Sequence, residues 1–245
     1  IRTLNRTGIG WLPGDLVSVF ARPTVGKTWF TLKIAAVAIN RGYRVLYVSP
    51  EMPVSAIELR LDVILGKMAG YEFSHRALRS GEQIDEDQYS KFLSENVAKK
   101  LLLCDNIDQE MISFAGIMSK VRKYKPDLLI LDGIQLVSSQ KANQAVWEKM
   151  HNLFYSMKNL STTNKIVSVV STQANRGASD YFSSPGIEHV AFGDALIQAS
   201  DVAFSMSMKK GDDKKRYIQC QKYRDGELPF RNLELNWDVD KGIIE

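Results

Sequence analysis

The amino-acid sequence predicts an α/β fold with a mainly parallel central sheet, flanking helices and antiparallel strands at the C-terminal side. From residue 16 to residue 172, short apolar runs that suit buried parallel strands alternate with segments of helical periodicity. After residue 201 this alternation stops, and three strand-like segments follow one another between turn signals. These two observations favour a parallel sheet that gains antiparallel strands at one side.

The predicted elements follow from these patterns in chain order. The first strand covers residues 16–20, and the helix after it runs from residue 28 to about residue 40. The second strand, residues 44–49, stops at a pair of prolines, and the next helix covers residues 54–69. Residues 76–100 are polar and helical, with the helix beginning after a loop around Ser80-Gly81. Further helical patterns cover residues 111–124 and 146–160, and further strand patterns cover residues 101–104, 127–132, 165–172, 202–208, 216–224 and 232–236.

Length and composition fit a single large domain. The chain has 245 residues, enough for a sizeable core, so we expect residues 1–245 to form one domain. It is 44% hydrophobic and 24% charged, and no apolar stretch approaches the length of a membrane-spanning helix. We therefore expect no membrane partner and a cytoplasmic location, or the host cytoplasm for a viral source. Because residue 1 is isoleucine, we also expect a fragment or a trimmed chain.

Charge, cysteine and histidine content add weaker constraints. The net charge of +4 is compatible with a polyanionic partner but too mild to establish one. Cys104 and Cys220 each lie in an apolar run, which suggests reduced core residues. The three histidines have no metal-ligand spacing around them, so we expect no structural zinc site.

The turn between the first strand and the first helix carries the end of a P-loop, Gly26-Lys27-Thr28. Backbone N–H groups in such a turn converge on a phosphate, and the following helix directs its positive end at the same anion. We expect Lys27 to reach the β- and γ-phosphates of ATP and the Thr28 hydroxyl to bind Mg²⁺. The predicted nucleotide-binding residues are Ala21, Arg22, Pro23, Thr24, Val25, Gly26, Lys27 and Thr28, together with Asp132.

One position departs from the usual P-loop pattern, because its leading glycine is replaced by Ala21. Alanine is small and tolerates the turn if its φ is negative, and Pro23 biases Arg22 away from the helical region. The alternative is a chance Gly-Lys-Thr in a βα turn. The strand before the motif and the helix after it favour nucleotide binding.

Three further polar residues follow predicted strands at their carboxyl ends. Ligands of open α/β sheets bind beyond these ends, so Glu51, Asp132 and Gln173 should face one crevice with the loop. We expect Asp132 to hold Mg²⁺, Glu51 to act as a general base and Gln173 to contact the γ-phosphate or its water. The alternatives are an ordinary strand-end acid for Asp132 and a solvated loop acid for Glu51.

Lys222 and Arg224 are two positions apart on a predicted strand, so both side chains should leave the same face. An ammonium beside a guanidinium suits a phosphate. The alternative is a pair of solvated charges that protects an edge strand, and the residues alone favour that alternative.

Together these segments resemble the ATPase domain of DnaB-like replicative helicases, a RecA-type motor family. Residues 21–28 are similar to its variant P-loop, in which A/G-R-P replaces the usual leading residues. Residues 49–52 (Ser-Pro-Glu-Met) resemble its S-L-E-M segment, and residues 132–136 resemble its D-Y-L-Q-L stretch. Residues 171–176 are similar to its S-Q-L-N-R sensor, and residues 222–226 match K-x-R-N-G. The motifs stand in family order.

The resemblance implies a RecA-like fold and an ATP-dependent, homohexameric replicative DNA helicase. It implies that Glu51 is the catalytic base, that Asp132 belongs to the Walker B stretch and that Gln173 belongs to a sensor. It also implies that Lys222 and Arg224 enter the nucleotide site of a neighbouring subunit. ATP hydrolysis at the interfaces would then drive 5′→3′ translocation on single-stranded DNA and unwinding of duplex.

DNA contacts and protein partners are implied less directly. Two loops, residues 137–145 and 174–193, would track the backbone of one strand, with Lys141 and Arg176 as candidate contacts. The alternative for both side chains is loop solvation. The arginine that often precedes the family's I-x-Q-x-A-D stretch is missing before residues 197–201. A region that docks primase or a helicase loader would precede residue 1, and we expect it to be absent.

Two other functional classes stay open at this point. One is a RecA- or RadA-like recombination ATPase that forms filaments on DNA, because the same core serves both activities. The other is a regulatory ATPase that needs no DNA. The K-x-R pair, the A-R-P loop and the S-P-E-M turn favour the helicase.

Overall fold

The computed structural model describes residues 10–82, 84–96, 101–104, 112–138, 145–174, 181–186, 190 and 193–245. The strands are β1 (Leu16–Ala21), β2 (Val45–Val48), β3 (Leu101–Cys104), β4 (Leu128–Asp132), β5 (Val167–Gln173), β6 (Val202–Lys209), β7 (Asp212–Tyr223), β8 (Leu233–Asp238) and β9 (Ile243–Ile244). The helices are α2 (Lys27–Asn40), α3 (Val54–Ala69), α4 (His75–Ser80), α5 (Glu86–Asn96), α6 (Phe114–Tyr124), α7 (Val146–Asn164) and α8 (Gly193–Ala199).

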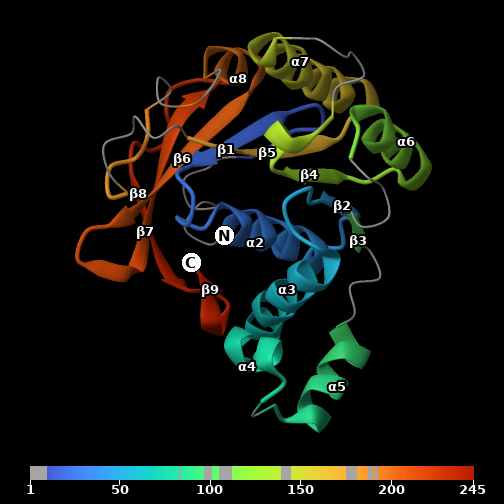
Figure 1. The fold of residues 1–245 in the computed structure, drawn as a ribbon, viewed down its shortest axis with the longest axis vertical. Coiled ribbons are helices and arrows are strands. Elements are labelled where there is room, and N and C mark those ends of the chain that lie inside the picture. The colour runs from blue at the N-terminus through green and yellow to red at the C-terminus, as the bar shows by residue number, and fades with distance from the viewer. Residues whose placement is uncertain are drawn as a thin grey trace.

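These strands form one sheet in the order β3-β2-β4-β5-β1-β6-β7-β8-β9 (Figure 1). Neighbours from β3 to β6 pair in parallel, whereas β7, β8 and β9 each pair antiparallel to the strand before them. The predicted fold class, a mainly parallel sheet with antiparallel strands at the C-terminal side, is confirmed.

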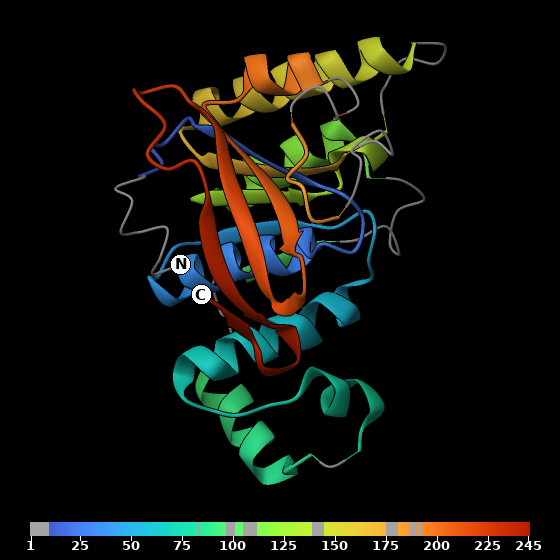
Figure 2. The ribbon, with the colours of Figure 1, turned by 90° about the vertical axis from the view of Figure 1, so that its left-hand side faces the viewer.

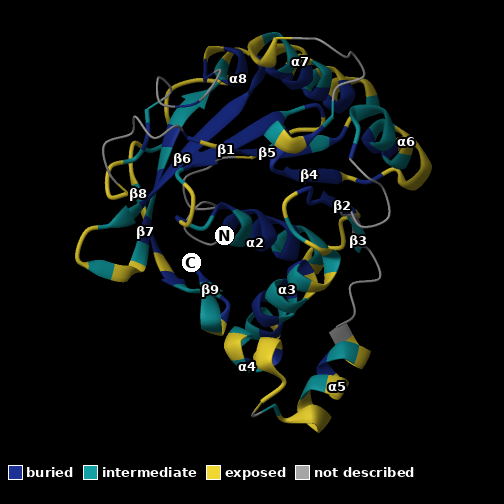
Figure 3. Ribbon diagram, viewed as in Figure 1, coloured by how far each residue is buried: buried dark blue, intermediate teal, exposed yellow. Residues whose placement is uncertain are grey.

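Helices cover both faces of the sheet, and each face has its own core (Figure 1). On one face α2 and α3 pack on the strands through residues such as Phe30 and Ile57. On the other face α6, α7 and α8 contribute Ile117, Phe154 and Leu196. Every residue of β1, β2 and β4 is buried, as expected for parallel strands covered on both sides (Figure 3).

The structure differs from the predicted elements at a few places. The predicted loop around residues 80–81 is present, and α5 follows it. The short helix α4 before the loop is not predicted, and Gly81 ends it with a φ of +73° that favours glycine. Residues 97–100 of the stretch predicted as helical lie outside the described residues. The sequence pattern does not predict α8 or β9, because seven and two residues are too short to give a periodic signal.

The helices α4 and α5 lie beyond the end of α3, away from the sheet (Figures 1 and 2). Aromatic rings hold them there: Phe73 lies 5.1 Å from Phe92 and 5.5 Å from both Tyr71 and Tyr89, measured between ring centroids. Among the described helices, none combines the length and apolarity needed to cross a bilayer.

Candidate active site

The sheet topology brings the predicted strand-end residues to one edge. Strands β2, β4, β5 and β1 are parallel neighbours, so their carboxyl ends lie side by side. The loop after β1, residues 22–26, begins at this edge, and Asp132 and Gln173 are the last residues of β4 and β5. Glu51 follows β2 and contacts Gln173. The structure therefore brings these residues to the same edge of the sheet.

The loop has the conformation of an anion-binding turn. Thr24 and Gly26 have φ angles of +67° and +114°, so successive N–H groups are turned toward one side before α2 begins. Two features require glycine at position 26. Its φ is positive, and a Cβ there would lie 2.3 Å from Cζ2 of Trp237. Ala21 is the last residue of β1 and pairs with Gln173. Its backbone is extended, so alanine fits at the position where the motif usually has glycine.

Lys27 lies inside the loop rather than in solvent. Its side chain is 9% exposed, and Nζ donates to the carbonyl oxygens of Ala21, at 3.2 Å, and Arg22, at 3.4 Å. Burial lowers the pKa of Lys27, while the carboxylates of Asp132 and Glu51 oppose that shift. An ammonium held at the loop between two acids is a point charge placed for a polyphosphate.

Asp132 is buried and rigidly held. It is 1% exposed and accepts hydrogen bonds from Ser171 Oγ, at 2.5 Å, and from the Tyr47 hydroxyl, at 3.2 Å. Burial and the Asp132 charge raise the pKa of Tyr47, so the phenol stays protonated and can donate. The two bonds leave acceptor positions on the carboxylate. One carboxylate and the Thr28 hydroxyl at the start of α2 form an oxygen donor set that fits Mg²⁺.

Glu51 is presented by a turn and oriented by two amides. Its Oε1 accepts from Gln135 Nε2, at 2.8 Å, and from Gln173 Nε2, at 3.3 Å. Partial burial and then the Asp132 charge raise the pKa of Glu51, while Lys27 and the two amides oppose the shift. A carboxylate with a raised pKa, fixed in direction, suits a general base.

Lys222 and Arg224 lie together at the opposite edge of the sheet. Tyr223 pairs with Val202 at the start of β6, and Val202 pairs with Val17 at the start of β1. The six residues of β1 span roughly 20 Å at about 3.3 Å per residue. Neither side chain can therefore reach the loop of its own chain.

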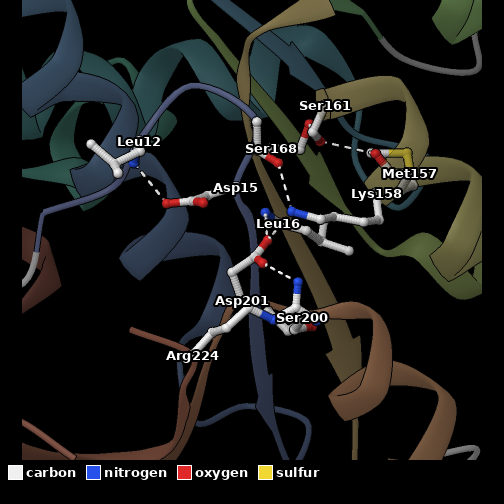
Figure 4. A network of polar contacts seen from close by, with 12 residues as sticks. Leu12, Asp15, Leu16, Met157, Lys158, Ser161, Ser168, Ser200, Asp201 and Arg224 are labelled. Carbon is white, nitrogen blue, oxygen red and sulfur yellow. Dashed lines mark hydrogen bonds and ion pairs between the residues drawn. The ribbon is translucent and has the colours of Figure 1, made fainter. Parts of the chain in front are cut away.

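Both cations instead contact the last turn of α8. Lys222 Nζ donates to Ile197 O at 2.5 Å, and Arg224 Nη2 donates to Gln198 O at 3.3 Å. Arg224 Nη1 also lies 2.7 Å from Oδ1 of Asp201 (Figure 4). Positive side chains are favourable at a helix C-terminus, so this placement holds the pair together without a bound anion.

Several residues that shape the site do not stand out in the sequence. Tyr47 and Ser171 lie inside buried strands and look like ordinary core positions. Arg216 is 7% exposed and donates from Nε to Val25 O at 2.9 Å, and its guanidinium lies over the Trp237 ring at 5.2 Å. The sequence does carry a signal that Arg216 is buried: it lies two and four residues before Ile218 and Cys220, so all three face the same side of β7.

The predicted DNA-contacting residues cannot be placed. Lys141 and Arg176 lie outside the described residues, as do large parts of the two loops that carry them. Cys220 is buried and unpaired, as predicted, and its burial raises the pKa of the thiol to about 11. The side chain of Cys104 lies outside the description.

Comparison with known proteins identifies similar sequences and folds. The replicative DNA helicase DnaB of Haemophilus influenzae is 26% identical over 99% of this chain, and the replicative DNA helicase DnaC of Bacillus subtilis is 23% identical over 94% of it. The chain spans 48% of the length of each of these relatives. The DNA repair protein RadA of Brucella abortus is 27% identical over 59% of this chain.

Two solved structures share the fold. One, described as an ATPase domain, superposes with a TM-score of 0.86 at 20% identity, covering 98% of this chain and 87% of that one. A DnaB-like replicative helicase, described with its interactions with primase, superposes with a TM-score of 0.82 at 21% identity, covering 96% and 58%. The family model of the DnaB-like helicase C-terminal domain matches residues 1–241. With the loop, the acids and the cationic pair in that family's order, the chain belongs to the DnaB-like helicase C-terminal domain family.

Proposed function

We propose that this domain is the ATPase motor of a homohexameric replicative DNA helicase, residues 1–245 acting as one RecA-like domain. Membership of the family implies ATP binding. The interface location of hydrolysis, the role of Mg²⁺ and 5′→3′ translocation are parts of the proposal. The observation that carries it is the separation of the loop and the cationic pair on opposite edges of the sheet.

At the loop edge, each residue has a part in holding or cleaving ATP. The loop N–H groups and Lys27 would bind the β- and γ-phosphates, as their turn geometry and burial favour. Thr28 and Asp132 would hold Mg²⁺, which when bound neutralises charge on the phosphate oxygens. Glu51 would take a proton from the attacking water, and Gln173, already bonded to Glu51, would contact the γ-phosphate or that water.

At the other edge, Arg224 and Lys222 would serve the nucleotide of the next subunit. An arginine in this role stabilises the charge that develops at the γ-phosphate and is worth on the order of 10³–10⁵ in turnover. Because β1 separates the pair from its own loop, one chain supplies half of each of two sites.

Mixed assemblies test this arrangement. Arg224→Ala should retain ATP binding and lose hydrolysis by about 10³-fold. Lys27→Ala should lose its own nucleotide site but keep a working Arg224. Assembled together, the two variants should recover part of the DNA-stimulated ATP turnover, because a Lys27→Ala chain can serve the site of an Arg224→Ala neighbour. No recovery at any mixing ratio would remove the trans role.

The proposed partners follow from the family and its relatives. Single-stranded DNA would be the track, and Lys141 and Arg176 stay candidate contacts. Primase and a helicase loader are proposed protein partners, the first because a structural relative is described with primase. A recombination ATPase is the rival function. Closed rings in electron micrographs with ATP and single-stranded DNA support the helicase, whereas continuous filaments support the rival.

A further inference from the structure

We propose that Asp201 is a positioning residue for Arg224: its buried carboxylate fixes the plane of the guanidinium before a neighbouring nucleotide arrives. The inference rests on the proposed trans role of Arg224. It adds a residue that touches neither ATP nor DNA and acts only through the arginine (Figure 4).

The contacts of Asp201 are directed and complete. Oδ1 accepts from Arg224 Nη1 at 2.7 Å. Oδ2 accepts from the backbone N–H of Leu16, at 2.8 Å, and from Lys158 Nζ, at 2.5 Å. Lys158 is itself anchored, because it also donates to Gly14 O at 2.9 Å. The acid is therefore held from β1 and α7 and presents one oxygen to the arginine.

The backbone reinforces the same geometry. The N–H of Asp201 donates to Leu16 O at 2.8 Å, and the N–H of Arg224 donates to Asp201 O at 2.9 Å. The start of β6, the start of β1 and the end of β7 are thus tied at one residue. Asp201 is 5% exposed, so water competes little for these bonds.

One edge of the Arg224 guanidinium is hydrogen-bonded within the chain, and the rest of the side chain is partly exposed to solvent. Its guanidinium bonds Asp201 through Nη1 and Gln198 O through Nη2, while the side chain stays 48% exposed. A guanidinium is planar with donors in fixed directions, so two bonds at one edge orient the remaining donors. Holding a flexible side chain in its working geometry before the encounter removes an entropic cost from the reaction.

Charge explains why an acid is needed here. Lys158, Lys222 and Arg224 gather around Asp201, and the cations disfavour one another. Asp15 interacts electrostatically with Asp201, Lys158 and Asp225, but its carboxylate is bonded to the N–H of Leu12. Without the Asp201 charge, repulsion from Lys158 and Lys222 would favour Arg224 orientations that turn away from the cluster.

The test replaces the carboxylate with its neutral isostere, Asp201→Asn, in the assembled protein. DNA-stimulated kcat should fall by about 10- to 100-fold, the loss expected for a misplaced catalytic group, with little change in KM for ATP. Asp127→Asn is the matched control. Asp127 accepts from the backbone N–H of Arg44 and forms an ion pair with the Arg44 side chain, but it directly precedes β4, which three strands of the sheet separate from β7.

Mixing identifies which site is affected. Asp201→Asn chains assembled with Lys27→Ala chains should recover turnover, because the partner supplies an intact Arg224. Asp201→Asn chains assembled with Arg224→Ala chains should not recover. If Lys27→Ala fails to restore Asp201→Asn but does restore Arg224→Ala, Asp201 serves its own chain and the inference is wrong. If Arg224→Ala alone retains full turnover, the proposed trans site fails instead.

A second variant covers the case in which Asp201→Asn does not fold. Lys158→Met keeps the carboxylate and the Arg224 contact but removes one anchor of Oδ2. It should show a smaller loss of kcat that Lys27→Ala chains again restore. A loss that they do not restore overturns the inference.

Discussion

Glu51 illustrates how the surroundings of one residue set its chemistry. Its pKa is raised from an ordinary value of 4.5, first by burial and then by Asp132. The amides of Gln135 and Gln173 favour the charged form and hold the shift back. A general base must be deprotonated, so turnover should be lost as the pH falls through this raised pKa.

This balance predicts the direction of a pH shift. Gln135→Leu removes one hydrogen bond to the carboxylate, so the pKa of Glu51 should rise further. The acid limb of kcat/KM for ATP should then move to higher pH, measured with saturating single-stranded DNA. Gln88→Leu, on the exposed face of α5, should leave the limb in place. An acid limb that moves to lower pH in Gln135→Leu would contradict the assigned base.

The residues of the site were predictable to different degrees. Asp132 and Gln173 are the last residues of two parallel strands, where topology gathers polar groups, and the P-loop motif marks Lys27, so the sequence indicates all three. Tyr47 and Ser171 do not stand out, because a polar atom inside a buried strand reveals its purpose only when its partner across the sheet is known. Asp132 supplies that partner for both.

Among the elements, α3 has the most informative packing. Gly66 lies in the last turn of this helix, at a helical position where alanine would ordinarily be favoured by up to about 1 kcal/mol. A Cβ at this position would meet the Phe73 ring at 2.5 Å, and Phe73 is fixed by Tyr71, Tyr89 and Phe92. The glycine therefore allows the ring cluster that carries α4 and α5 to pack closely on α3.

A stability measurement checks this packing. Gly66→Ala should lower the free energy of unfolding by about 1–3 kcal/mol, the usual effect of overpacking, despite the better helix propensity. Gly66→Ala combined with Phe73→Leu should regain part of the loss. Gly70→Ala is the control, because a Cβ there meets nothing within 4 Å and only its φ of +91° is strained. Increased thermal stability in Gly66→Ala would show that the contact is not tight.

Element boundaries show where sequence patterns lose information. The helix α3 begins and ends as predicted, because its apolar spacing is regular and prolines precede it. In the polar stretch after residue 75, the glycine predicts the loop around residues 80–81 and the helix α5 after it, whereas α4 has only six residues and gives no periodic signal of its own. β7 begins at Asp212 because tertiary pairing with β6 overrides a local turn signal.

At the scale of the whole molecule, β7 connects two different sites. Near its beginning, Arg216 bonds the loop that precedes Lys27 in the same chain. At its end are Lys222 and, one residue beyond the strand, Arg224, for which we propose a role in the site of a neighbouring chain. On that proposal, a chain that is alone has its binding loop but lacks the cationic pair of its catalytic site.

Dilution should separate binding from turnover. ATP turnover per chain should fall when the protein is diluted below its assembly concentration, because each hydrolysis event needs the cationic pair of a second chain. ATP binding, measured by fluorescence on the same samples, should persist. Arg224→Ala should turn over slowly at every concentration and so provides the baseline. Turnover that stays constant as sedimentation shows the assembly falling apart would contradict an interface site.

The cationic pair and the nucleotide-binding loop lie at opposite ends of the parallel strands, and this placement also restricts the symmetry of an assembly. A two-fold dimer joins the same surface patch of both chains, so it can bring the cationic pair to the loop only if both lie within that one patch. If the pair and the loop lie on separate surfaces, as the proposed trans role has it, the contacts between chains are heterologous, head to tail. In an open head-to-tail stack, the nucleotide-binding loop of one terminal chain then has no cationic pair from a neighbour. Only closure into a ring gives every loop such a pair.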